Sequence, residues 1–267
     1  MLCDTDEVLL NAINMAKEAG KVQLEYFRSP NLDIAVKLNE SDVVTVADKA
    51  SEAIIIDRIK SLYPGHSILS EESGEEDKHS DYLWVIDPLD GTTNFSAGLP
   101  QFCVSIGLKY KGETIIGVVY APYLDELFTA VRGEGAFLNG EPIKTGSKTN
   151  IHQAVVSTGF PVDKDRTPDN NLDNLERVLP LVRGMRRMGA AAVDICYVAA
   201  GLLDAYWEMN LHEWDVCAGL LIASEAGATE YHFRNDRNVS VLVASPKIGE
   251  MIIPLLSSKP RQEKCSS

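Results

Sequence analysis

The stretch of sequence that decides the fold reads Leu83-Trp84-Val85-Ile86-Asp87-Pro88-Leu89-Asp90-Gly91-Thr92-Thr93. Its apolar, β-rich beginning breaks at Asp-Pro, which predicts a buried strand that ends in a loop. Asp87 and Asp90 then leave the strand end together, because Pro88 fixes one φ angle and Gly91 allows a sharp turn. Two carboxylates that face one point suit a hard divalent cation.

The residues after Asp90 suit an anion. Gly91, Thr92 and Thr93 are small and have free backbone N–H groups. A helix that begins there would hold an anion beside the metal through these groups and its dipole. The stretch therefore indicates metal next to phosphate. The alternative is an ordinary loop, because Asp-Pro and Asp-Gly are common turn pairs.

The composition limits the classes of partner. With 267 residues, 45% of them hydrophobic, the chain can bury a large core, as one domain or as two packed lobes. The formal net charge of −14 argues against nucleic acid or an anionic membrane as a partner, because both need a cationic face. Bound Mg²⁺ would let such an acidic protein hold an anionic substrate, since carboxylates attract the metal and the metal attracts phosphate.

The sequence also predicts a location. No apolar run reaches the length of a membrane span, and the acidic residues 1–7 lack the features of a signal peptide. The cysteines are scattered and odd in number, without a CxxC pair, at Cys3, Cys103, Cys196, Cys217 and Cys265. They are typical of reduced thiols in a cytoplasmic protein and suggest neither a disulfide framework nor zinc.

Periodicity predicts an α+β amino half, residues 1–145, and an α/β carboxyl half, residues 146–256, which share one interface. Expected helices cover 8–26, 47–62, 171–179, 194–203 and 215–225, and expected strands cover 83–86, 104–110, 114–120, 127–131, 155–157 and 241–244. Ile55, Ile59 and Leu62 are expected on the inner face of the second helix. Asn139-Gly140 is a hairpin signal. The polar tail, residues 257–267, is expected to fray.

Further polar side chains stand at the ends of expected elements. Glu71 follows the short apolar run 67–69, Glu208 follows an aromatic run, and Asp215 begins an apolar helix. Asp48 and Lys37 complete the set. Each has a plain alternative: Glu71 in a solvated acidic turn, Asp215 and Asp48 as helix caps, and Glu208 and Lys37 as surface residues. Position favours a site, because sites in layered α/β folds gather where strands end.

Together these motifs resemble the inositol monophosphatase family. The resemblance is carried by residues 43–48, the Glu71-Glu72-Ser73 turn, residues 87–95, 133–140 and 204–209, and Trp214-Asp215-Val216 with Ala218-Gly219. It extends from about residue 8 to 250, and the order and spacing of the motifs are specific. It implies an α+β / α/β layered sandwich with alternating αβαβα layers, of the inositol monophosphatase and fructose-1,6-bisphosphatase type. It also implies a homodimer.

Carried over by position, the resemblance gives each residue a role. The metal ligands are Glu71, Asp87, the carbonyl of Leu89, Asp90 and Asp215, for two or three Mg²⁺ ions. Glu71 and Thr92 orient the attacking water, and Asp48 holds the threonine hydroxyl. The substrate contacts are Asp90, Gly91, Thr92, Thr93, Gly189, Ala190, Ala191, Glu208 and Asp215. The sequence departs from the inositol-preferring pattern at Ala190, often threonine there, and at Glu213, cysteine in some members.

The resemblance implies a lithium-sensitive, Mg²⁺-dependent phosphatase that hydrolyses a phosphate monoester of a polyol or sugar, foremost myo-inositol monophosphate, without a phosphoenzyme. The same chemistry on histidinol phosphate, fructose 1,6-bisphosphate or 3′-phosphoadenosine phosphates is the first alternative. A silent relative that binds phosphate or a partner protein is the second. The presence of every expected ligand and of the water-orienting pair argues against silence.

Overall fold

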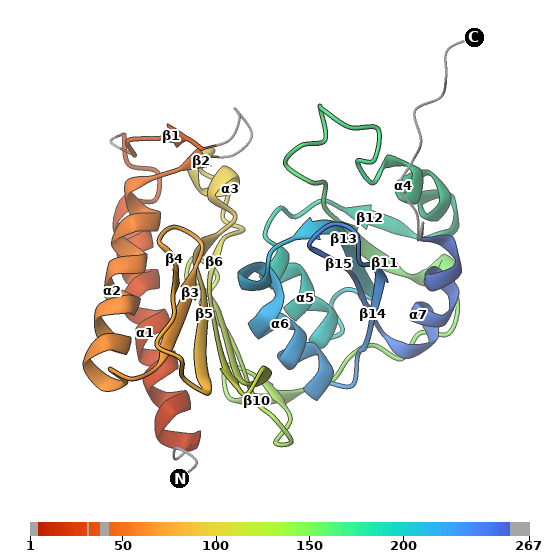
Figure 1. Cartoon of the computed structure of the whole chain (residues 1–267). Helices are drawn as coiled ribbons and strands as arrows, with labels where there is room; N and C mark the ends of the chain where they lie inside the picture. Colours follow the sequence, from red (N-terminus) through yellow and green to blue (C-terminus); the bar gives the residue numbers. More distant parts are fainter. Residues whose placement is uncertain (1–4, 31, 38–42, 257–267) are drawn as a thin grey trace.

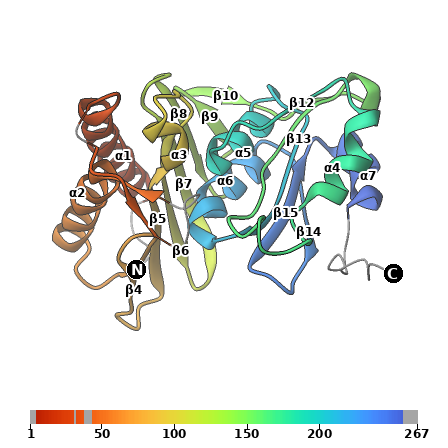
Figure 2. The ribbon, with the colours of Figure 1, turned by 90° about the horizontal axis from the view of Figure 1, so that it is seen from above.

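The computed structural model describes residues 5–30, 32–37 and 43–256. Helices and sheets alternate in layers, seen from the side and from above (Figures 1 and 2). Helices α1 (Thr5–Tyr26) and α2 (Val46–Leu62) cover the larger sheet, and α5 (Ala191–Ala199) and α6 (Glu213–Glu225) lie between the two sheets. Helices α4 (Leu172–Val178) and α7 (Pro246–Ile252) cover the smaller sheet. The layered sandwich predicted from the sequence is confirmed, and the tail 257–267 lies outside the described residues.

The larger sheet has eight strands in the described part of the chain, in the order β10-β9-β8-β7-β6-β5-β3-β4. Its strands are β3 (Ser67–Ser70), β4 (Gly74–Glu76), β5 (Tyr82–Asp90), β6 (Cys103–Tyr110), β7 (Glu113–Ala121), β8 (Glu126–Val131), β9 (Ala136–Leu138) and β10 (Glu141–Ile143). Only β3 and β5 pair in parallel. Strands β1 (Ala35–Val36) and β2 (Val43–Val44) form a separate pair, and α3 (Thr92–Ser96) follows β5.

The smaller sheet has five strands among the described residues, in the order β12-β11-β13-β15-β14. They are β11 (Val155–Thr158), β12 (Gly184–Arg186), β13 (Ala205–Leu211), β14 (Thr229–Arg234) and β15 (Val239–Ala244). Strand β11 runs parallel to β12 and β13, and β15 runs antiparallel to β13 and β14. Short 3₁₀ turns cover Ile151–Gln153, Leu179–Leu181 and Ile253–Leu255. The chain passes from one sheet to the other after β10, close to the predicted division at residue 145.

Each layer boundary holds an apolar core. The first core packs α1 and α2 on the larger sheet around Met15, Ile55 and Trp84. The second surrounds α5 and α6 and includes Ile195 and Ile222. Because α5 and α6 contact sheets on two sides, their apolar residues are buried all round rather than along one stripe.

Two glycines set the distance between α6 and the larger sheet. A Cβ at Gly107 would lie 2.5 Å from the sulfur of Cys217, and one at Gly117 would lie 2.7 Å from the carbonyl oxygen of Ala218. Glycine on β6 and β7 therefore lets the helix approach the strands closely, which brings the beginning of α6 to the ends of β5 and β6.

Several element predictions are confirmed and several are corrected. The Asn139-Gly140 hairpin joins β9 to β10 with positive φ at both residues, 51° and 83°. Strand β5 does not break at Asp-Pro but continues to Asp90 through an irregularity after Asp87. Helix α5 begins at Ala191, earlier than residue 194, and ends at Ala199. Leu62 is 48% exposed and not on the inner face; it is the last residue of α2, and the following Tyr63 packs against Trp84 instead.

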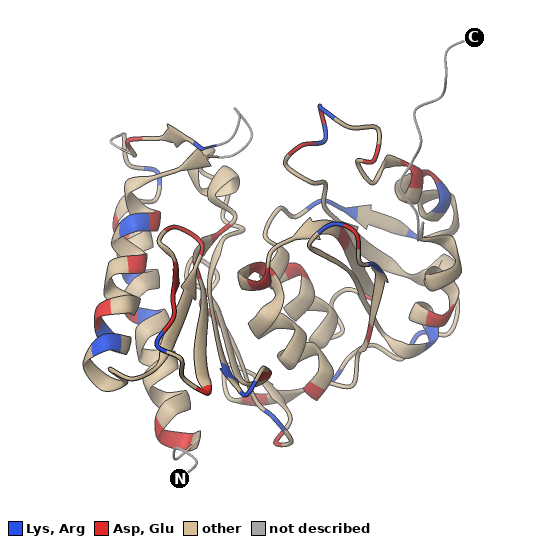
Figure 3. Cartoon of the chain, viewed as in Figure 1, with Lys and Arg blue, Asp and Glu red and all other residues tan. Residues whose placement is uncertain are grey.

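Charges are spread over the surface, and Figure 3 shows acidic residues on β4 and at the beginning of α6. Across the described residues, no helix combines the length and the apolar character that a bilayer crossing requires.

Candidate active site

Glu71 and Asp87 are brought together by the parallel pairing of β3 and β5. Ser70 is the register partner of Ile86, and the backbone N–H of Glu71 donates to the carbonyl of Ile86 at 3.2 Å. Parallel neighbours end at the same edge of a sheet, so Glu71 and Asp87 leave that edge side by side. The Asp87 carboxylate accepts the Leu89 N–H at 3.0 Å. Gln23 of α1 donates its side-chain amide to the carbonyl of Pro88 at 2.7 Å and so ties the end of β5 to this helix.

Asp90 faces the layer of helices between the two sheets. Its carboxylate accepts the N–H of Ala192 in the first turn of α5 at 2.7 Å, and the thiol of Cys103 lies 3.7 Å from the same oxygen. Asp90 is buried. The end of β5 in the amino half is therefore joined directly to a helix of the carboxyl half.

Asp215 reaches the same place from α6. It is the third residue of the helix rather than its cap, and its carboxylate accepts the N–H of His212 at 2.7 Å. Ser105 is the register partner of Asp87 on β6, and its hydroxyl lies 3.4 Å from the carbonyl of Trp214. The capping interpretation of Asp215 is thus correct in part, but the residue also lies beside the carboxylates of the larger sheet.

Like charges crowd this position. Burial, followed by the charges of Glu71, Asp90 and Asp215, raises the pKa of Asp87 well above its ordinary value. Burial and then the charge of Asp90 raise the pKa of Asp215, and burial raises that of Asp90 to about 6. A divalent cation would relieve this repulsion, so the donor set fits a hard metal ion.

The carboxylates do not form a closed cage. Among the described His, Cys, Asp and Glu side chains, no group of three or more is arranged as a ready metal site. Asp90 and Asp215 each direct an oxygen to a helix N–H, and Glu71 pairs with Lys37 at 2.9 Å. A cation bound here would complete its coordination with the Leu89 carbonyl and water, and Mg²⁺ commonly retains several waters.

The half-buried Thr92 and the buried Asp48 form a hydrogen-bonded pair. The Thr92 hydroxyl lies 2.9 Å from one oxygen of Asp48 and 3.1 Å from the carbonyl of Leu89. The other oxygen of Asp48 accepts the N–H of Thr45 at 2.8 Å and its hydroxyl at 2.6 Å. Asp48 therefore caps α2 and holds Thr92 at the same time. Burial raises its pKa.

Gly91 turns the chain between Asp90 and Thr92. It has a φ of 91°, and a Cβ there would lie 2.8 Å from the carbonyl of Gln101. Only glycine fits this turn, after which α3 begins at Thr92. That its N–H groups bind an anion stays a prediction. Thr93 is exposed, and its carbonyl accepts the hydroxyl of Ser96 at 2.9 Å.

A cavity of about 420 Å³ opens beside the carboxylates. Lys37, Glu71, Glu208 and Asp215 contribute polar groups, and apolar walls come from residues 160–162, Met209, Leu211 and Trp214. Glu208 is half-buried on β13 and accepts the hydroxyl of Tyr206 at 2.7 Å. Burial raises its pKa to about 7.

The remaining predicted substrate contacts, residues 91–93 and 189–191, are not among the residues that line this cavity. The Cβ of Ala190 and the carbonyl of Gly189 are 3.2 and 3.3 Å from the place of a Cβ on Gly91, so residues 189 and 190 adjoin the turn that is predicted to bind phosphate. Glu71 lines the cavity, and its charge acts on the carboxyl groups of Asp48, Asp87 and Asp90. Thr92 joins this set through its hydrogen bond to Asp48. The structure thus brings the predicted residues into one neighbourhood from elements far apart in sequence.

Sequence reasoning missed several supporting residues. Gln23 and Ser105 sit in periodic apolar stretches and carry no motif, so no signal in the sequence marks them. Lys37 was recognised without its partners, and it pairs with both Glu71 and Glu72. The charges of these two carboxylates raise the pKa of Lys37 although burial opposes the rise.

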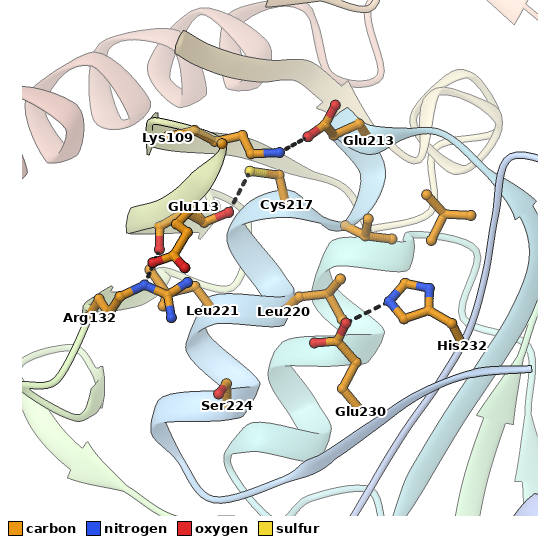
Figure 4. Close-up of a pocket in the computed structure, with 14 residues that line it drawn as sticks. Lys109, Glu113, Arg132, Glu213, Cys217, Leu220, Leu221, Ser224, Glu230 and His232 are labelled. Atoms are coloured by element: carbon orange, nitrogen blue, oxygen red, sulfur yellow. Dashed lines mark hydrogen bonds and ion pairs between the residues drawn. The ribbon is translucent and has the colours of Figure 1, made fainter. Parts of the chain in front are cut away.

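A larger cavity, about 490 Å³, lies on α6 away from these carboxylates (Figure 4). Its polar groups pair with one another: Lys109 with Glu213, and His232 with Glu230 at 2.7 Å. None of the predicted site residues lines it. The smaller cavity is therefore the candidate active site, despite its size.

The comparison with known protein families agrees with this geometry. The model described as the inositol monophosphatase family matches residues 4–261. The chain belongs to the inositol monophosphatase family. This membership confirms the resemblance predicted from the motifs.

Relatives within the inositol monophosphatase family carry two kinds of name. Nus factor SuhB of Pasteurella multocida is 44% identical over 248 residues, which cover 91% of this chain and 92% of the relative. The crystal structure of extragenic suppressor protein SuhB from Bartonella henselae has a TM-score of 0.87 at 35% identity, covering 93% and 98% of the two chains. Inositol monophosphatase from Anabaena has a TM-score of 0.84 at 36% identity, covering 94% and 96%. Family membership supports a phosphatase, and the names leave the substrate open.

Proposed function

We propose that the protein hydrolyses a phosphate monoester with Mg²⁺, and that its substrate is myo-inositol monophosphate. The observation that carries the proposal is the meeting of Glu71, Asp87, Asp90 and Asp215 beside the Thr92–Asp48 pair. Metal-binding carboxylates and a hydroxyl held by a buried carboxylate, at the edge of one cavity, suit phosphate transfer to water.

Each residue of the candidate site would have its own role. Glu71, Asp87, the Leu89 carbonyl, Asp90 and Asp215 would hold two or three Mg²⁺ ions. When bound, Mg²⁺ supplies a water of lowered pKa and neutralises charge on the leaving oxygen. No side chain needs to form a covalent bond to phosphorus.

Thr92 orients the water because its hydroxyl donates within the protein and can only accept from the water. Its single hydroxyl proton is directed to Asp48 and the Leu89 carbonyl, at 2.9 and 3.1 Å. The hydroxyl oxygen is therefore left as an acceptor. A water that donates one proton to Thr92 and the other to Glu71 turns its lone pair toward the phosphorus held over residues 91–93.

Glu208 selects the alcohol part of the substrate. Its carboxylate lines the cavity together with Asp215 and would accept a hydrogen bond from a substrate hydroxyl. Ala190 cannot supply the hydroxyl that inositol-preferring members often have there, so the same chemistry on histidinol phosphate, fructose 1,6-bisphosphate or 3′-phosphoadenosine phosphates is kept as the alternative.

A second candidate function comes from the name Nus factor carried by the relatives, which is not the name of an enzyme. In that case the chain binds a partner of the transcription machinery, with or without phosphatase activity. The net charge of −14 argues against nucleic acid as the partner, but it leaves a protein partner open. Pull-down of RNA polymerase subunits by wild-type protein and by Asp90→Asn separates the two functions, since partner binding alone would survive the substitution.

The test of the first candidate is phosphate release from inositol 1-phosphate, with and without EDTA, followed by a substrate panel at one Mg²⁺ concentration. We expect release that EDTA abolishes and added Mg²⁺ restores. Absence of release from every ester tested, at saturating Mg²⁺, would leave the partner-binding candidate. Light scattering tests the homodimer, which we propose from the family resemblance. Cell fractionation tests the cytoplasmic location, which we propose from the scattered cysteines, typical of reduced thiols.

A further inference from the structure

The segment between β11 and α4, residues 159–171, forms one wall of the candidate active site; we call it the wall loop. Phe160, Pro161 and Val162 line the cavity opposite Glu208 and Trp214. At its beginning the loop touches the Glu208 carboxylate, because a Cβ on Gly159 would lie 1.8 Å from a Glu208 oxygen. The path of this loop therefore decides how much room lies in front of Glu208.

The two ends of the wall loop are tied to each other. Asn171, fully buried and with a φ of 73°, donates its side-chain amide to the Gly159 carbonyl at 2.6 Å and the Thr158 hydroxyl at 3.0 Å. Its side-chain oxygen accepts the indole N–H of Trp207 on β13 at 3.1 Å. The loop is closed at its base, next to the strand that carries Glu208.

The middle of the wall loop is held by two arginines from the β14–β15 hairpin. One nitrogen of Arg237 lies 2.7 Å from each carboxylate oxygen of Asp163, and another donates to the carbonyl of Asp169 at 2.9 Å. Arg234, with a fully buried side chain, donates to the carboxylate of Asp169 at 2.6 Å. Figure 3 shows charged residues of both signs on these two segments. Asp163 directly follows the cavity-lining residue Val162, so the Arg237–Asp163 contact acts on the wall itself.

The hairpin and Glu208 belong to the same rigid sheet. Strand β15 pairs with β13, and Glu208 is the register partner of Val241, four residues after Arg237. Arg237 lies in the turn that joins β14 to β15, so its contact ties the wall loop to the sheet that carries Glu208. An ordinary exposed ion pair has no such connection to a site and contributes little.

We infer that Arg237 and Asp163 form a latch that holds residues 160–162 against Glu208 and so sets the fit of the substrate's hydroxyl-bearing part. Arg237 is a positioning residue: it acts through the wall loop and lines no part of the cavity. The inference rests on the proposed phosphatase function for its kinetic consequence. Its structural consequence, a loop closed by the latch, is independent of any activity.

The kinetic test uses Asp163→Asn, which keeps the shape of the side chain and removes its charge. We expect KM for inositol 1-phosphate to rise about three- to tenfold, as for loss of a charge-assisted contact, with kcat within about twofold of wild type because the metal ligands are untouched. Arg237→Gln should behave alike, and Asp163→Glu should restore most of the fit. Asp173→Asn is the matched control, because it removes an aspartate–arginine pair, with Arg177, from the helix that follows the loop.

The structural test is limited digestion with trypsin, since Lys164 and Arg166 are exposed sites inside the wall loop. Cleavage at these sites, followed by mass spectrometry, should be at least about fivefold faster in Asp163→Asn and Arg237→Gln than in wild type or Asp173→Asn, because cleavage follows the population of the opened loop. Equal digestion of all variants overturns the latch. Faster digestion with an unchanged KM, or a fall in kcat alone, overturns its role in substrate fit. If wild-type protein hydrolyses no ester, the proposed function fails, and the digestion rates alone support or overturn the latch.

Discussion

Replacing Thr92 by alanine tests the central chemical assignment. The substitution removes a hydroxyl that lies 2.9 Å from the buried carboxylate of Asp48 and 3.1 Å from the Leu89 carbonyl. Asp48 keeps both of its contacts to Thr45, at 2.8 and 2.6 Å, so the cap of α2 remains in place. We therefore expect a folded protein with an altered site.

The size of the effect follows from the kind of hydrogen bond that is lost. A hydrogen bond to a charged group contributes about 1.5–3 kcal/mol. If Thr92 orients water only in the transition state, that energy appears in kcat as a loss of about 10- to 150-fold, at about 1.4 kcal/mol per factor of ten. We propose that backbone N–H groups and Glu208 bind the ester, so KM should change by less than about threefold.

The assay is steady-state release of phosphate from inositol 1-phosphate at saturating Mg²⁺, with circular dichroism to confirm folding. Thr92→Ser retains a hydroxyl and should recover most of kcat. Ser96→Ala is the matched control on α3, because it removes a hydroxyl that donates to the Thr93 carbonyl at 2.9 Å. A rise in KM with kcat unchanged, or an equal loss of kcat in Ser96→Ala, would refute the water-orienting role.

Three further predictions concern the metal, the alcohol subsite and lithium. Asp90→Asn should lower kcat by about 100-fold or more with the fold intact, since it removes a proposed metal ligand and leaves phosphate charge unscreened; near wild-type turnover in a folded variant contradicts the site. Burial raises the pKa of Glu208 to about 7, so the carboxylate that accepts hydrogen bonds prevails only above that pH. KM for inositol 1-phosphate should therefore fall as pH rises through about 7. Glu208→Gln should abolish this pH dependence of KM and change the ranking of esters. LiCl should inhibit in an uncompetitive or noncompetitive manner, because Li⁺ is near Mg²⁺ in size with half its charge, and Asp215 substitution should alter this inhibition. If a NaCl series gives the same inhibition curve as the LiCl series, the prediction is wrong.

Much of the candidate site could be predicted because the carboxylates of Glu71, Asp87 and Asp90 lie at strand ends that the sequence marks plainly. The run before Asp87 and the run before Glu71 are short, apolar and followed by carboxylates, and parallel pairing of β3 with β5 places both at one edge. The link between Asp48 and Thr92 came from the family resemblance, and the structure has the contact at 2.9 Å. Their roles in catalysis stay predictions.

Element boundaries were less predictable where tertiary contacts override local signals. Asp-Pro indicated a break, yet β5 continues to Asp90 because β6 pairs with it up to Cys103. Helix α5 begins at Ala191, before the expected start, because the Asp90 carboxylate accepts the N–H of Ala192 and so satisfies a donor of its first turn. Spacing alone predicted Leu62 in the core, but Leu62 is exposed at the end of α2, and Tyr63, the cap residue, packs against Trp84.

The sequence by itself determined the alternation of helices and strands, the acidic ligand set and the family, because periodicity and motif spacing are local properties. Only the tertiary structure decided which polar groups support that set. Gln23, Ser105, Asp163 and Arg237 lie far from the motifs along the chain, and their contacts arise from how the layers stack. Such contacts depend on distances between elements that no local pattern encodes, whereas carboxylates at strand ends depend on the strand alone.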